Sequence, residues 1–77
     1  MQYERFPTTC NEHYDLISVL YHALEGAWKC EIYHRDAEKA GDQTLAQFFR
    51  ETQQEECARA ERAKALLRNR MGVLSTT

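Results

Sequence analysis

Residues 37–49, AEKAGDQTLAQFF, contain the point at which this 77-residue chain is expected to reverse direction. Glycine readily adopts the left-handed conformation that ends a helix, and aspartate is a favoured N-cap, so Gly41-Asp42 predicts the end of one helix and the start of another. A connection this short requires the two helices to lie side by side and antiparallel. The stretch therefore predicts an all-α helical hairpin.

Long helices are expected on both sides of this turn. Thr9-Cys10-Asn11-Glu12 fits a capping box, in which the side chains of the first and last residues satisfy amides of the first turn. Beyond it, Gly26 is the one residue of the first helix that disfavours helix, and Gly72 ends the second helix. We expect an irregular arm at 1–8, a hairpin at 9–72 with helices at about 10–40 and about 43–71, and a tail at 73–77.

Composition narrows the class of protein. Charged residues make up 29% of the chain, hydrophobic ones 43%, and the net charge is −2, which is ordinary for a folded soluble protein and gives no reason to expect binding to nucleic acid or to a membrane surface. The three cysteines are odd in number and widely spaced, which does not indicate a disulfide framework. With neither a signal peptide nor a run of ~20 apolar residues, the sequence predicts a reduced, cytoplasmic protein.

Apolar residues recur with helical spacing over an arc wider than an ordinary surface helix needs. On the first helix the arc comprises Leu16, Leu20, Ala23, Ala27, Cys30, His34 and Ala37, widened by Ile17, Leu24, Trp28 and Val19. On the second helix it comprises Leu45, Phe48, Phe49, Thr52, Ala63, Leu66 and Leu67. A lone hairpin would leave part of these arcs in water, so we predict a homodimer in which two hairpins form a four-helix bundle.

The run from residue 20 to residue 67 resembles one helical hairpin of the ferritin-like superfamily, closest to rubrerythrin-type proteins. The matching features are the turn at 40–41, the Leu-Ala-x-Phe-Phe opening at 45–49, Glu56, and Ala60-Glu61-Arg62-Ala63. The resemblance implies that a short single-hairpin member dimerises to complete the bundle. It also implies a diiron centre, in which Glu56 matches the glutamate of a Glu-x-x-His motif.

The residues of this sequence depart from that ligand set. Arg59 occupies the histidine position and Ala23 the position of the carboxylate on the first helix. A guanidinium offers no lone pair and would repel a divalent cation. Arg59 therefore replaces the charge of the metal in an ion pair with Glu56, which in a dimer would form a quartet across the interface, or it pairs with Glu55 on the surface.

A second constellation lies on the first helix. Glu31 and His34 form an intact Glu-x-x-His, and Cys30 with His34 is a pair of soft ligands one turn apart, which two-fold symmetry would double toward a zinc site. A core histidine with a hydrogen-bonded partner is the alternative reading. Tyr14, Tyr21, Trp28 and Tyr33 recur at spacings near seven, which is typical of residues at a bundle edge or interface.

Two classes of function follow. The first is a non-catalytic ferritin-like structural or protein-interaction module without a cofactor and with an unidentified protein partner. Its core ion pair or dimer interface comprises Glu56, Arg59, Leu16, Leu20, Ala23, Ala27, Trp28 and Phe49. The second is a metal-binding or redox protein holding iron, manganese or zinc in a rearranged site, with Glu56, Glu31, His34 and Cys30 as ligands. No catalytic signature is present.

Overall fold

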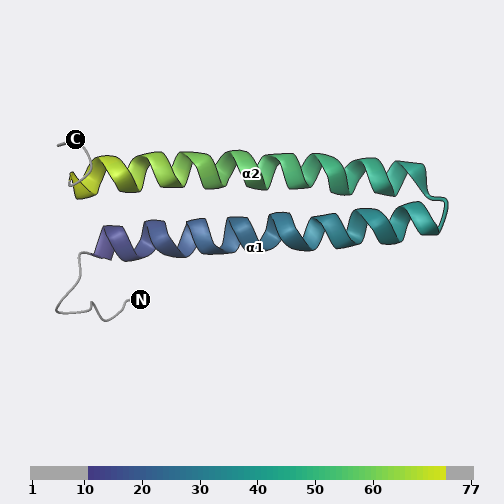
Figure 1. The fold of residues 1–77 in the computed structure, drawn as a ribbon, viewed down its shortest axis with the longest axis horizontal. Helices are drawn as coiled ribbons and strands as arrows, with labels where there is room; N and C mark the ends of the chain where they lie inside the picture. The colour runs from purple at the N-terminus through teal and green to yellow at the C-terminus, as the bar shows by residue number, and fades with distance from the viewer. Residues whose placement is uncertain (1–10, 73–77) are drawn as a thin grey trace.

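The computed structural model describes residues 11–72, which form two long helices lying side by side (Figure 1). Helix α1 spans Asn11–Lys39 and helix α2 spans Gln43–Met71. The predicted all-α hairpin is confirmed, and residues 11–72 include no strand. The predicted arm, the Thr9 and Cys10 part of the capping box, and the tail lie outside the described residues.

The turn between the helices has the geometry that its sequence predicts. Gly41 adopts a φ of +76°, in the left-handed region. Its amide donates to the Glu38 carbonyl at 3.0 Å and the Asp42 amide donates to the Ala37 carbonyl at 3.0 Å, the paired bonds of a Schellman motif. The Asp42 carboxylate then accepts from the Leu45 amide at 3.0 Å and caps α2. Three residues, 40–42, thus connect the end of one helix to the start of the next.

Small side chains fill the seam between the helices. The residues that are buried are Ala23, Ala27, Cys30 and Ala37 of α1 with Ala46, Ala60 and Ala63 of α2. Consecutive buried positions are three, four, seven or fourteen residues apart, which places each set on one face of its helix. Because alanine adds so little bulk, the two helices can approach closely along this seam.

Within one hairpin, the seam uses only part of the predicted apolar arcs: the alanines and Cys30 of α1 and Ala63 of α2 are buried. Leu45, Phe48 and Leu66 of the α2 arc are 40%, 57% and 41% exposed. Ala46 and Ala60 occupy the seam in their place. The cause is steric, since a seam that brings two backbones together selects small side chains and displaces large ones to its flanks.

Large apolar side chains therefore flank the seam on two sides of the hairpin. In an antiparallel pair of right-handed helices, residues that immediately precede seam positions on both helices share one side, and residues that immediately follow them share the other. We call the first side the groove face, which comprises Val19, Tyr33, Leu45, Phe48 and Leu66. We call the exposed stripe of α1 on the second side the α1 outer face, which comprises Tyr14, Ile17, Tyr21, Leu24 and Trp28.

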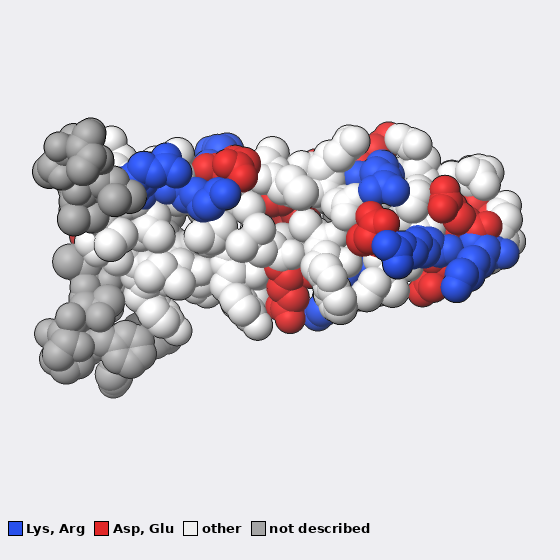
Figure 2. All heavy atoms as spheres, viewed as in Figure 1, with Lys and Arg blue, Asp and Glu red and all other residues white. Residues whose placement is uncertain are grey.

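Contacts within the molecule agree with this assignment of sides. The Tyr33 and Phe49 rings lie 5.4 Å apart and the Phe48 and Phe49 rings 5.6 Å apart, which joins both helices across the groove face. An open groove on the same side is lined by Leu16, Val19, Arg59, Arg62, Ala63 and Leu66. Figure 2 shows uncharged side chains along the N-terminal half of α1, whereas charged side chains gather toward the turn and over the C-terminal half of α2.

Candidate functional site

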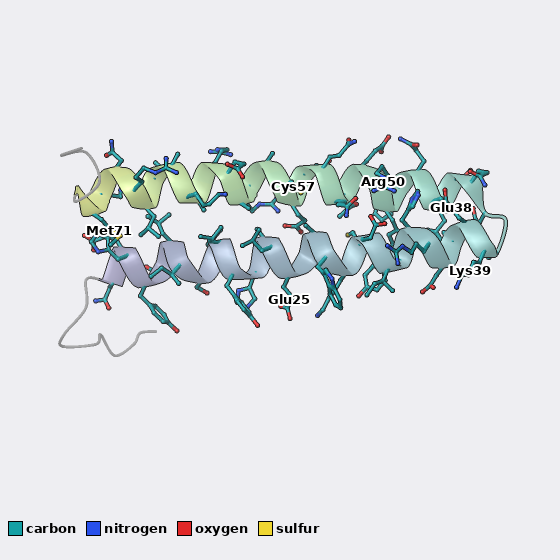
Figure 3. The ribbon with its side chains drawn as sticks, in the orientation of Figure 1. Glu25, Glu38, Lys39, Arg50, Cys57 and Met71 are labelled. Carbon is teal, nitrogen blue, oxygen red and sulfur yellow. The ribbon has the colours of Figure 1, made fainter. Side chains whose placement is uncertain are left out.

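A cluster of polar side chains bridges the helices in the half of the hairpin that is nearer the turn. The Glu31 carboxylate accepts from Arg50 at 3.1 Å and from Gln53 at 3.2 Å, both on α2, and from Arg35 of its own helix at 3.3 Å. Gln53 also donates to the Ala27 carbonyl at 3.1 Å. Arg50 extends from this half of α2 in Figure 3. These bonds hold α1 and α2 in one register.

The environment of Glu31 favours its charged form. Hydrogen bonds from Gln53 and Arg50 lower the pKa of the Glu31 carboxyl below its usual value, and the charges of Arg50 and Arg35 act in the same direction. Two arginines already neutralise this carboxylate. A metal ion at Glu31 would have to displace or face these cations, so the surroundings do not suit a cation ligand.

The lowered pKa predicts a specific loss of stability in acid. Because the folded pKa of Glu31 lies below the unfolded one, its contribution is fully present above about pH 4.3 and is lost as the pH falls through the folded pKa. We expect Glu31→Gln to lower the urea midpoint at pH 7, and the difference from the wild type to shrink as the pH falls below 4. Glu55→Gln is the control, because it removes an exposed acid that has no ion pair among the described residues. If Glu31→Gln lowered the urea midpoint by the same amount at pH 7 and below pH 4, the prediction would be contradicted.

His34, the other half of the Glu-x-x-His motif, contacts different groups. Its Nδ1 lies 2.8 Å from the Ala46 carbonyl oxygen, so this nitrogen carries a proton and donates to α2. Its Nε2 lies 3.1 Å from the Glu38 carboxylate. His34 thus acts as a half-buried residue with hydrogen-bonded partners, and it ties the first turn of α2 to α1. Glu31 and His34 do not share a partner.

Glu56 and Arg59 form an ion pair within one chain. Arg59 Nη1 donates to Glu56 Oε1 at 2.6 Å, so within one chain Arg59 pairs with Glu56 and not with the alternative partner Glu55. The Glu56 side chain is 26% exposed and that of Arg59 52%. The carboxylate therefore sits at the edge of the seam, while the guanidinium extends toward solvent on the groove face.

Gly26 and Cys30 of α1 border the Glu56 carboxylate. A Cβ atom added at Gly26 would lie 3.2 Å from Glu56 Cδ, so the glycine leaves the space that the carboxylate occupies. Burial raises the pKa of the Cys30 thiol, and the negative charge of Glu56 raises it further. A buried thiol with a raised pKa is a poor nucleophile and a poor metal ligand at neutral pH.

Gly26→Ala tests how firmly Glu56 is held. Alanine removes the helix penalty of glycine, worth about 1 kcal/mol, while the new methyl group must displace the end of a flexible side chain by a few tenths of an ångström. We expect a net stabilisation of about 0.5–1 kcal/mol in urea unfolding. Gly26→Ala in a Glu56→Ala background, where no carboxylate opposes the methyl group, is the control. A destabilised single variant would show that Glu56 is rigidly fixed.

The other residues predicted for the core or the dimer interface separate into two groups. Ala23 and Ala27 are buried against α2 of the same chain, and Leu16, Leu20 and Phe49 are half-buried around the seam. Trp28 is 67% exposed and belongs to the α1 outer face. Among residues 11–72, no three His, Cys, Asp or Glu side chains lie together in a group that could hold a metal ion.

The sequence interpretation missed Arg50 and Gln53 as residues that join the helices. One signal was available, because Gln53 lies seven residues after Ala46 and seven before Ala60, in line with the seam. Arg50 follows one turn after Ala46, and its long side chain reaches Glu31 from the flank.

Comparison with known proteins yields no relative. No family model matches this chain, and neither a curated protein nor a solved structure matches it. In residues 11–72, neither helix is long and apolar enough to span a membrane.

Proposed function

We propose that this protein is a non-catalytic structural or protein-interaction module that works as a homodimer, with two hairpins packed through their groove faces into a ferritin-like four-helix bundle. The proposal rests on which side chains the hairpin buries and which it leaves exposed. Its seam buries alanines and one cysteine, while large apolar side chains stay outside. A monomer whose stability came from its own core would bury the large side chains first.

The groove face supports this role because it spans both helices. Leu45 and Phe48 lie near the turn, and Leu66 lies near the other end, 40–57% exposed. A second hairpin laid on this face would cover them and extend the two-helix seam into a four-helix core, as the spacing of heptad-like positions favours. The resemblance to ferritin-like hairpins points to the same assembly.

Glu56 and Arg59 give this bundle a polar layer without a metal. In the ferritin-like pattern these positions would carry two ligands, whereas here a fixed positive charge already neutralises the carboxylate. Such a pair adds little stability but favours one register of the two hairpins. We place the protein in the reducing cytoplasm, where Cys30 and Cys57 remain free thiols.

The alternative role, a metal-binding or redox protein, requires each ligand to exchange its present partner. Glu56 would have to leave Arg59, and Glu31 would have to leave Arg50 and Gln53. Elemental analysis of protein purified without chelator separates the two roles. Stoichiometric iron, manganese or zinc that is lost in Glu56→Ala would overturn the non-catalytic module in favour of the metal protein.

Sedimentation at micromolar concentration tests the bundle. We expect the wild type to sediment as at least twice the chain mass of 9.0 kDa. Phe48→Glu places a charge within the proposed contact, at the most exposed apolar side chain of the groove face, and should abolish the bundle contact. Ala58→Glu adds the same charge on the exposed back of α2 and should behave as the wild type. A monomeric wild type, or a Phe48→Glu variant of unchanged mass, would overturn the proposal.

A further inference from the structure

We infer that the α1 outer face is a second self-association surface, which binds the same face of another copy with the two α1 helices antiparallel and the two-fold axis at Tyr21. This surface goes beyond the proposed bundle. Tyr21 and Trp28 follow seam positions, whereas the groove face precedes them, so the two surfaces lie on opposite sides of the hairpin. A bundle formed through the groove face leaves the α1 outer face uncovered.

The exposed area of this face fits an interface. Ile17 is 49% exposed, Tyr21 61%, Leu24 51% and Trp28 67%. Together with Tyr14 these side chains present roughly 500 Å² of mostly apolar surface. Two copies thus supply about 1,000 Å², which is near the minimum area of a biological interface between proteins. The area argues for one helix-sized partner rather than for several small contacts.

The order of residue types makes the face self-complementary. Tyr14, Ile17, Tyr21, Leu24 and Trp28 alternate aromatic and aliphatic, and the series reads the same in both directions from Tyr21. When a second α1 lies antiparallel on a two-fold axis at Tyr21, Trp28 faces the copy's Tyr14 and Leu24 faces the copy's Ile17. A two-fold interface requires this match of a patch with itself.

The charges beside the face also favour a second copy. Glu25 pairs with Lys29 at 3.7 Å at the border of the stripe that lies away from α2, and Glu61 pairs with Lys64 at 3.0 Å on α2, across the seam from the other border. Opposite charges are therefore already matched along the borders of the stripe. The stripe itself carries no net charge that would favour an anionic lipid surface, a nucleic acid or an acidic peptide. An uncharged apolar helix is therefore the partner that fits it.

Tyr21→Glu is the sharpest variant, because the two-fold axis would bring two introduced carboxylates together and raise the dissociation constant by about 100-fold or more. Trp28, the single tryptophan, provides the readout. We expect its fluorescence emission in the wild type to shift to shorter wavelength as the protein is concentrated through the association range. In Tyr21→Glu the emission should keep the wavelength of an exposed indole. Circular dichroism verifies that the variant is folded, and Ala58→Glu is the charge-matched control.

Sedimentation of Tyr21→Glu beside Phe48→Glu separates this inference from the bundle. If both surfaces act, the wild type is larger than a dimer and each variant is a dimer. If Tyr21→Glu alone becomes monomeric, the α1 outer face is confirmed and the bundle is overturned. If Tyr21→Glu changes neither the mass nor the Trp28 emission, the inference is overturned whatever Phe48→Glu does. A monomeric wild type overturns both.

Discussion

Ala60→Leu is expected to destabilise the protein by about 1–3 kcal/mol, because the larger side chain must enter a seam that is already filled. Ala60 is 1% exposed, the lowest value among the buried residues. Leucine at this position either adopts a strained rotamer or pushes α2 away from α1. The second outcome would also loosen the neighbouring bond between Gln53 and the Ala27 carbonyl. A domain of this size is stable by roughly 5–10 kcal/mol, so the loss is a large share of the total.

Ala58→Leu is the matched control for this variant. It makes the same change two residues earlier on the exposed back of α2, where leucine and alanine have similar helix propensities and no packing changes. We expect its stability to stay within about 0.5 kcal/mol of the wild type. Urea unfolding at one fixed protein concentration compares the three proteins, since association also changes apparent stability. Equal stability of the two variants would show that the seam is loosely packed.

Gly41→Val is expected to cost about 1–2 kcal/mol, because the residue holds a left-handed φ of +76° that a side chain with a branched Cβ strongly disfavours. No atom lies within 4 Å of the position that a Cβ would take, so the cost is conformational and not a clash. The strained turn would also weaken the Schellman bonds to Glu38 and Ala37. The same urea series measures this loss.

Gly72→Val is the control for the turn. Gly72 has a φ of +73°, nearly that of Gly41, and it likewise leaves open space where a Cβ would be. It ends α2 but does not join the two helices, so the helix can fray by a turn without disturbing the seam. We expect a loss below about 0.5 kcal/mol. Equal losses in both variants would mean that the turn at Gly41 contributes no more than an ordinary helix end.

The positions of the helices were predictable because their signals are local. The backbone preferences of Gly41 and Asp42 specify the turn, and the long runs without proline allow the helices to continue. The candidate site was predictable only in part. Glu56 and Arg59 stand one turn apart on one helix, and the structure does pair them. The partners of Glu31 on α2 depend on how the helices are aligned, which no spacing within α1 reveals.

The sequence by itself determined that two long helices reverse at Gly41-Asp42, since backbone conformation there depends on the residues of the turn alone. Only the tertiary structure decided which face of α2 turns inward. The periodicity placed Leu45, Phe48 and Leu66 on the predicted inner face of α2, because the burial of large apolar side chains contributes the most free energy. The close approach of two helices favoured Ala46 and Ala60 instead, and it left the large side chains outside for a partner.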